Sequence, residues 1–516
     1  MEHALWLLCA TLAVSTLLYY LANMQSRRRH SGTGGGRRRI LLPPGPRPLP
    51  LVGNLLDLRA GNLHHTLASL ARAHGPVMRL RLGLTTAVVV SSRDAAREAF
   101  ARHDGSLSAR AVPDMARAAG FAERSMIWLP SSDPRWKSLR GVVATHAFSP
   151  RSLASARGVR ERKVRDMVSY IRVHAGQPVD VGRAVYGGVI NLVSSALFAV
   201  DVVDDVGDES AQGLRELVEE LVEAIVKPNV SDLFPFPRPL DIQGWRRWTA
   251  RRFHKLFRVL DGIVDRRLAE DEASSTSSKD DDTHGDFLGA LLELMSTGKL
   301  TRGDVRAIMF DVFGAGTGTI AITVELAMAE LLRHPSIMAK VRMELESALG
   351  NTKAIEEPDV VSLPYLQAVV KEAMRLHPVA PILLPHQASE DGVVLGGYAV
   401  PKGCTVIFNS WAIMRDPAAW ERPDEFIPER FLDGEHETVG FRGREFKLIP
   451  FGSGRRLCPG LPMAERVVPL VLASLLRAFE WRLPDGVSAE QLNVTEKFTT
   501  SNVLAVPLRA VPIVIT

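Results

Sequence analysis

The amino-acid sequence predicts a mainly α-helical fold with smaller β-sheets, of the α+β class, behind one N-terminal membrane-spanning helix. Apolar residues recur at helical spacing over most of residues 140–380. Short runs such as VMRLRLG and TTAVVVSS are rich in the residues that favour strands. An uncharged apolar run, Ala4–Ser26, lies near the N-terminus. We therefore expect a helical body with short strands and an anchor ahead of it.

Length and composition exclude several classes of protein. A chain of 516 residues could form about three domains, but no flexible linker divides its middle, so we expect one catalytic domain over residues 60–516. The net charge of +5 is small, and no basic stripe interleaved with aromatic residues is present, so nucleic acid is not an expected partner. Cys9, Cys404 and Cys458 are too few and too scattered for a disulfide framework. Such cysteine usage is typical of a protein in a reducing compartment.

The N-terminal segment predicts a membrane anchor at residues 1–26. At about 1.5 Å per residue, Ala4–Ser26 can cross a hydrocarbon core of roughly 30 Å. Six arginines follow it between Arg27 and Arg39, and positive charge after a span keeps that side cytoplasmic. A cleaved signal peptide is the alternative, but its charges would precede the apolar run. Residues 27–59 are predicted as a basic linker and a proline-rich hinge, because LLPPGPRPLPLVGN cannot form a helix.

The body shows helices and strands in a definite order. HHTLASLARAHG predicts a helix that ends at Gly75, and two strands joined by a turn follow it. Helical spacing dominates residues 140–270, and the charged low-complexity stretch Ala269–Asp286 predicts a surface loop. Further helices, short strands in GVVLGGYAVPKGCTVIFNS and irregular chain lead to Cys458, which a last helix follows.

Cys458 lies in FGSGRRLCPG, among three glycines, two arginines and a proline. A buried structural cysteine is the simplest interpretation of a lone thiol. A thiolate is also the iron ligand that favours O–O cleavage in heme sites. Glycines let backbone N–H groups approach the sulfur, and a helix that begins after Pro459 would direct its positive end toward it.

This decapeptide resembles the heme-binding signature of the cytochrome P450 family, F-x-x-G-x-R-x-C-x-G. The resemblance implies a heme b cofactor whose iron is bound by Cys458, and a monooxygenase that inserts one atom of O2 into a hydrophobic small molecule. It extends over nearly the whole chain, from LPPGPRPLPLVGN to the final strands. The residues of the signature that it assigns to cofactor binding are Phe451, Gly454, Arg456 and Gly460.

Other segments match the family in the expected order. KEAMRLHP places Glu372 and Arg375 at i, i+3 on one helix face, and FIPERF supplies Arg430. In the family the matching residues form a buried ion network behind the heme. The resemblance also implies positive or polar partners for the two heme propionates, which are Arg110, Trp136, Arg140 and His386 alongside Arg456. It places the substrate pocket beside Ile382, Leu383 and Leu384.

The segment Phe310–Pro335 predicts a helix through the centre of the molecule. By resemblance, Ala315 and Gly316 line the heme groove, and the catalytic hydroxyl of Thr319 holds water that carries protons to dioxygen. Gly318 stands where the family has Asp or Glu, so the proton relay lacks its acid. Three interpretations stay open: an oxygenase with an altered relay, a heme-dependent isomerase or dehydratase that needs no O2, and a poorly active heme protein.

The substrate and partners follow only from resemblance. AVYGGVINLVSSALFAVDVVD and NVSDLFPFPRPLDIQGWRRWTARR are similar to plant microsomal members, and in particular to the terpenoid-hydroxylating enzymes of grasses in diterpenoid phytoalexin pathways. This implies hydroxylation of a diterpenoid, with electrons from NADPH through NADPH–cytochrome P450 reductase. It also implies a single-pass protein of the endoplasmic reticulum membrane, in contact with lipid, whose catalytic domain is cytoplasmic.

Overall fold

The computed structural model describes residues 40–515 except 60, 204–208, 228, 237, 276–285, 351–353 and 433. The predicted anchor at residues 1–26 and the basic part of the linker lie outside the described residues. The described part of the proline-rich hinge runs along the first strand, where the Arg79 N–H donates to the Pro44 carbonyl at 2.7 Å. A Cβ on Gly45 would lie 2.0 Å from the Arg79 carbonyl oxygen, so this approach requires glycine. The hinge therefore packs on its own protein.

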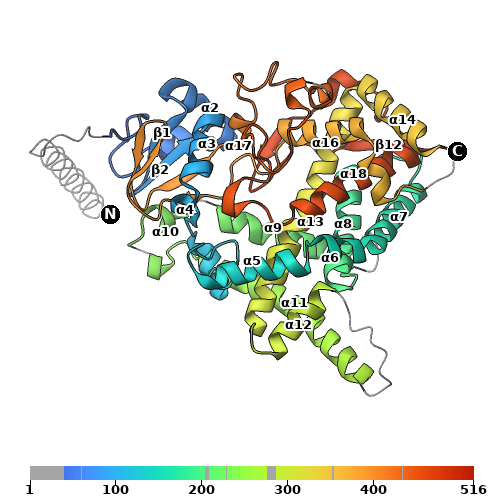
Figure 1. Ribbon diagram of the computed structural model, residues 1–516, viewed down its shortest axis with the longest axis horizontal. Helices are drawn as coiled ribbons and strands as arrows, with labels where there is room; N and C mark the ends of the chain where they lie inside the picture. The colour runs from blue at the N-terminus through green and yellow to red at the C-terminus, as the bar shows by residue number, and fades with distance from the viewer. Residues whose placement is uncertain are drawn as a thin grey trace, which may run out of the picture.

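The described chain is mainly helical, and its sheets are small (Figure 1), as the sequence predicts. The helices are α2 Leu63–His74, α3 Arg93–Arg102, α4 Asp104–Leu107, α5 Pro134–His146, α6 Pro150–Ser155, α7 Arg157–Val173, α8 Val181–Phe198, α9 Glu209–Val226, α10 Val230–Leu233, α11 Trp245–Ser275, α12 Phe287–Ser296, α13 Arg302–Arg333, α14 Pro335–Leu349, α15 Glu357–Val361, α16 Pro364–Leu376, α17 Ser410–Ile413 and α18 Leu461–Ala478. The strands are β1 Val77–Leu82, β2 Thr85–Val90, β3 Ala109–Arg110, β4 Val179–Asp180, β5 His386–Gln387, β6 Val393–Leu395, β7 Tyr398–Val400, β8 Thr405–Phe408, β9 Phe479–Arg482, β10 Glu496–Phe498, β11 Asn502–Leu504 and β12 Arg509–Val514.

The largest sheet brings distant segments together. Its strand order is β1-β2-β8-β5-β3, with β1 and β2 antiparallel as predicted and β2 and β8 parallel. At its inner edge β3 pairs with β5, and the register sets Arg110 opposite His386. Two residues far apart in the sequence are thereby fixed side by side.

Helix α13 crosses the centre of the molecule (Figure 1) and packs against α8, α16 and α18. It begins at a capping box, in which Thr301 and Asp304 each accept a backbone N–H of the other. The predicted helix after Cys458 is α18, whose N-terminal capping residue is Gly460. The N-terminus of α18 therefore lies directly at the cysteine loop.

Two described helices are long and apolar enough to cross a bilayer by length and composition alone, α8 and α13. In their most apolar windows, 89% of α8 and 67% of α13 is buried inside the protein. Both are thus core helices of the described fold.

One predicted boundary is wrong. The sequence analysis assigned Ala269–Asp286 to a loop, but α11 continues to Ser275. Alanine and glutamate are good helix formers, and extending an existing helix costs no new nucleation, so the helix propagates into the charged stretch. Asp286, at the other end, accepts the Gly289 N–H as the N-terminal cap of α12.

Candidate functional site

A cavity of about 340 Å³ lies between α13, the loop that holds Cys458, and the ends of α5 and β5. Most of its lining is apolar, with residues from α8 and α18 completing the wall. It brings together thirteen of the predicted site residues, namely Arg110, Trp136, Arg140, Ala315, Gly316, Thr319, Leu383, Leu384, His386, Phe451, Arg456, Cys458 and Gly460. These residues come from five separate stretches of sequence.

Five predicted residues do not line this cavity. Ile382 packs instead with Leu67, Met78, Leu80 and Val89 in a second hydrophobic cluster. Gly454 lies on the outer side of the cysteine loop with φ of +67°, and a Cβ there would meet an Asp104 carboxylate oxygen at 2.1 Å. Glycine at 454 therefore serves the shape of the loop. The other three, Glu372, Arg375 and Arg430, form a separate cluster.

The Cys458 thiol sits at the N-terminus of α18. Its own N–H donates to the Phe451 carbonyl at 3.1 Å, which closes the loop. Burial raises the pKa of the thiol, while the N–H groups of Gly460 and Leu461 and the guanidinium of Arg140 lower it. Each opposing influence stabilises a thiolate, and bonding to a metal ion would deprotonate the sulfur outright.

The guanidinium groups of Arg110, Arg140 and Arg456 converge on the cavity, and among the described residues none of the three forms an ion pair with a carboxylate of the cavity wall. Burial, and then repulsion from its neighbours Arg456 and Arg140, lowers the pKa of Arg110 to about 9. Burial and Arg140 together lower the pKa of Arg456 to about 10. Their visible partners are carbonyl groups: Arg140 donates to Leu457 at 2.9 Å, and Arg456 donates to Ser108 at 2.8 Å. Clustered buried cations of this kind call for an anion.

The cavity face of α13 carries Ala315 and Thr319, which are four residues apart. The Thr319 hydroxyl donates to the Ala315 carbonyl at 2.8 Å, so its oxygen keeps its lone pairs for a ligand. Thr317, by contrast, is buried away from the cavity and donates to Phe313 at 2.8 Å. Gly318 does not line the cavity either.

Comparison with known proteins decides the family, since the cytochrome P450 family model matches residues 43–506. The chain belongs to the cytochrome P450 family. It is 65% identical to Cytochrome P450 76M5 of Oryza sativa subsp. japonica, over 99% of each chain. It is 56% identical to Oryzalexin D synthase and 55% identical to Ent-cassadiene C11-alpha-hydroxylase 1 of the same organism, over 100% of each chain. The protein is thus a cytochrome P450 monooxygenase, of a family that uses thiolate-ligated heme iron.

The donor set of this cytochrome P450 fits a heme. A buried nitrogen, Arg110 Nε, has no hydrogen-bond partner among the described residues. Three guanidinium groups aimed at one cavity match the two negative propionates of a heme, which form strong charge-assisted hydrogen bonds. A thiol lies on the same lining, where it could reach the iron. The cavity therefore offers cationic partners for the heme propionates and a sulfur ligand for the heme iron.

Two predicted propionate partners already use one donor each. Trp136 Nε1 donates to the Met126 carbonyl at 3.1 Å, and its ring lies 4.8 Å from the Arg456 guanidinium carbon. His386 Nδ1 donates to the Leu107 carbonyl at 2.7 Å, so only Nε2 is left for another group. Burial, followed by Arg110, lowers the pKa of His386 well below its ordinary value. Because the Met126 carbonyl already accepts its N–H, Trp136 supports Arg456 through its ring rather than through a hydrogen bond.

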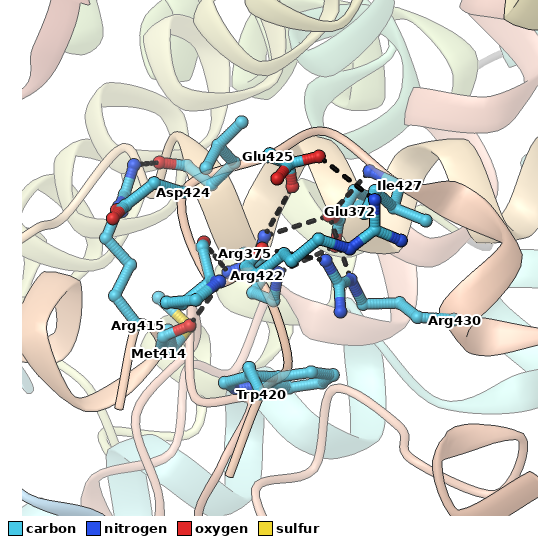
Figure 2. Close-up of polar contacts among 12 residues, drawn as sticks. Glu372, Arg375, Met414, Arg415, Trp420, Arg422, Asp424, Glu425, Ile427 and Arg430 are labelled. Carbon is cyan, nitrogen blue, oxygen red and sulfur yellow. Dashed lines mark hydrogen bonds and ion pairs between the residues drawn. The ribbon is translucent and has the colours of Figure 1, made fainter. Parts of the chain in front are cut away.

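The three remaining predicted residues form a buried ion network (Figure 2). Arg375 donates to both carboxylate oxygens of Glu372, at 2.7 and 2.8 Å, and Arg430 Nε donates to Glu372 at 3.1 Å. Arg375 also donates to the Met414, Pro423 and Glu425 carbonyls. The network fixes the irregular chain of residues 414–430 against α16, on the way to the cysteine loop.

Sequence reasoning missed several lining residues. Val193 and Leu197 of α8, Phe148 and Ile127 line the cavity but have no motif, and apolar residues at helical spacing look like core. Asp311 of α13 was also missed. One signal could have found it, because Asp311 is the only acidic residue between Asp304 and Glu325 in a strongly apolar run.

Proposed function

We propose that this cytochrome P450 hydroxylates a diterpenoid in its cavity, and that Cys458 is the residue whose sulfur would hold the iron of heme b. The observation that carries the proposal is the shared lining, on which the Cys458 thiol, three buried guanidinium groups, the Thr319 hydroxyl and a mostly apolar wall meet. The apolar wall suits a large hydrocarbon skeleton. Two of the relatives are named Oryzalexin D synthase and Ent-cassadiene C11-alpha-hydroxylase 1, and these names support the substrate class.

Each residue has a part in this proposal. The bound heme supplies dioxygen activation. Arg110, Arg140 and Arg456 hold its propionates, and the N–H groups at the start of α18 keep Cys458 as a thiolate. Thr319 holds the water through which a proton reaches the reacting oxygen. The apolar side chains exclude bulk water and position the carbon to be oxidised.

The proposal extends to the organisation of the chain. Residues 1–26 anchor it in the endoplasmic reticulum membrane, residues 27–59 form the linker and hinge, and residues 60–516 form the cytoplasmic catalytic domain. Electrons come from NADPH through NADPH–cytochrome P450 reductase. The apolar run Ala4–Ser26 and the arginines that follow it support this topology.

Turnover under isotopically heavy dioxygen tests the function. The full-length membrane protein is incubated with a plant reductase, NADPH and a panel of diterpenoids, and the products are weighed by mass spectrometry. We expect one heavy oxygen atom per molecule of product. A product without the label would favour the isomerase or dehydratase alternative. NADPH consumption without any product would favour the poorly active alternative that Gly318 raises.

A further inference from the structure

Asp311 is a buried carboxyl group on the wall of the cavity. It lies on α13, is 3% exposed, and lines the cavity with Ala315 and Thr319. Of the described residues that line the cavity, it is the only aspartate or glutamate. No step of the proposed function uses it.

Neutral donors hold this carboxyl group. The Ser125 hydroxyl donates to Asp311 Oδ1 at 2.7 Å, and the Met126 N–H donates to Oδ2 at 2.8 Å. These bonds fix the loop of residues 125–127 against α13. The Ile127 N–H also acts on this carboxyl group, and because a carboxyl group offers about four lone-pair sites, acceptor capacity remains beyond these three donors. Because Asp311 lines the cavity, that capacity is open to a ligand.

The chemistry of Asp311 suits a hydroxyl group. Burial raises the pKa of Asp311 to about 7, although the bonds from Ser125 and Met126 oppose this. The group is therefore partly protonated near neutral pH and can both donate and accept a hydrogen bond, as an alcohol can.

The position of Asp311 suits a rigid ring system. Asp311 precedes Thr319 by eight residues, which is about 12 Å along a helix axis, and residues 311, 315 and 319 share one face. A ligand held by its hydroxyl group at Asp311 would present its far end near Thr319. A fused-ring hydrocarbon body would fill the apolar space between the two residues.

We propose that Asp311 anchors a hydroxyl group of the substrate, so that the preferred substrate is a diterpenoid that is already monohydroxylated. This inference rests on the proposed diterpenoid hydroxylation and narrows it. A hydrocarbon would leave the buried carboxyl group without its ligand partner, which is how sites reject analogues that lack a hydroxyl. An earlier oxidation must then supply the alcohol that this enzyme consumes.

Equilibrium dialysis of the full-length holoenzyme tests the anchor without relying on turnover. The probes are labelled ent-cassadiene, a set of its monohydroxylated derivatives, and the methyl ether of the alcohol that binds best. In the unchanged protein we expect at least one alcohol to bind about tenfold more tightly than the hydrocarbon. The methyl ether should lose most of this advantage, because it cannot donate a hydrogen bond.

Three variants separate the anchor from the loop-holding role of Asp311. Asp311→Ala should remove the preference for the alcohol. Asp311→Asn should keep most of it, since an amide both donates and accepts and can still bind the Met126 N–H. Ser125→Ala is the matched control: it loosens the loop but leaves the carboxyl group, so it should weaken alcohol and hydrocarbon by the same factor.

The outcomes distinguish the two proposals. Equal affinity of the unchanged protein for the hydrocarbon and every alcohol would overturn the anchor and leave diterpenoid hydroxylation standing. The same would follow if Asp311→Ala weakened both ligands equally. Binding of neither ligand would overturn the diterpenoid substrate class and the anchor with it. If Asp311→Ala fails to fold, the methyl ether comparison in the unchanged protein decides the matter.

Discussion

Gly318 lies against the ring of Tyr186: a Cβ added at residue 318 would sit 3.9 Å from Tyr186 Cε2, an ordinary van der Waals distance. Tyr186 belongs to α8, and Arg215 of α9 stacks on the same ring with its guanidinium carbon 4.5 Å from the ring centroid. Arg215 is itself paired with Glu219 at 2.8 Å, so the feature that Tyr186 leaves open beside residue 318 is space for a side chain. Glycine here is not required by crowding.

Gly318→Asp should therefore fold and raise the product formed per NADPH consumed. Its carboxyl group would restore an acid next to Thr319 in sequence, and aspartate is tolerated within a helix slightly better than glycine. The measurement is product and NADPH loss in the same reaction. Gly318→Ala is the control, since it adds the Cβ without the acid. An unchanged ratio in the aspartate variant would refute the missing-acid argument.

Thr319→Ala should lower product formation by about a hundredfold and increase the peroxide released per NADPH. The substitution removes the cavity-facing hydroxyl, and general acid–base help is commonly worth about 10²–10⁴ in rate. Thr317→Ala is a matched control, because Thr317 also donates to the carbonyl four residues earlier but is buried off the cavity. Equal losses in the two variants would show that only helix stability was affected.

Glu372→Ala should destabilise the fold by about 3–5 kcal/mol, because it leaves the buried Arg375 charge without its partner. The free energy of unfolding by urea, followed by circular dichroism, measures this. Arg422→Ala is the comparison: its ion pair with Glu425 is exposed, and such pairs contribute about 0–1 kcal/mol. Similar losses in both variants would contradict the role given to the network.

The free energy of unfolding should fall as the pH rises above neutrality, because His377, which connects the end of α16 to α13, then loses its proton. His377 Nε2 lies 2.7 Å from Glu330 Oε1, and Nδ1 contacts Glu496. Burial lowers the pKa of His377, but the two carboxylates outweigh it, and the net pKa is raised. The stabilisation is therefore fully present below the unfolded value of about 6.5 and is lost as the pH passes the raised pKa.

Urea midpoints between about pH 6 and about pH 9 check this prediction. The difference in midpoint between the unchanged protein and Glu330→Gln should shrink toward the alkaline end, since the variant lacks one of the two carboxylates. A difference that stays constant with pH would mean that His377 does not change its charge in the folded protein.

Local motifs made part of the site predictable. The loop around Cys458 and the i, i+3 pair of Glu372 and Arg375 owe their geometry to residues a few positions apart, so the sequence contains it. Gly454 was also found from the motif, but the contact that requires a glycine there is with Asp104 of another helix, which the sequence does not reveal. Helix and strand patterns likewise located the central helix α13 and the β1–β2 hairpin.

Tertiary packing decided the rest. Arg110 meets His386 only because β3 and β5 pair in one register. Ile382 and Leu383 are neighbours in sequence, yet Ile382 packs in the second hydrophobic cluster whereas Leu383 and Leu384 line the cavity, and this irregular segment has no period from which the difference could be predicted. Asp311 reaches the cavity through the rotation of α13, which depends on how α8, α16 and α18 pack around it.

X-ray absorption at the iron edge of the purified holoenzyme tests the central claim most directly, that the cavity is a heme-thiolate site built on Cys458. We predict one sulfur atom among the nearest neighbours of the iron in the unchanged protein and in Cys404→Ser, whose thiol is buried elsewhere. The sulfur should be missing in Cys458→Ser. A sulfur neighbour that persists in Cys458→Ser, or that is absent from the unchanged protein, would contradict the account.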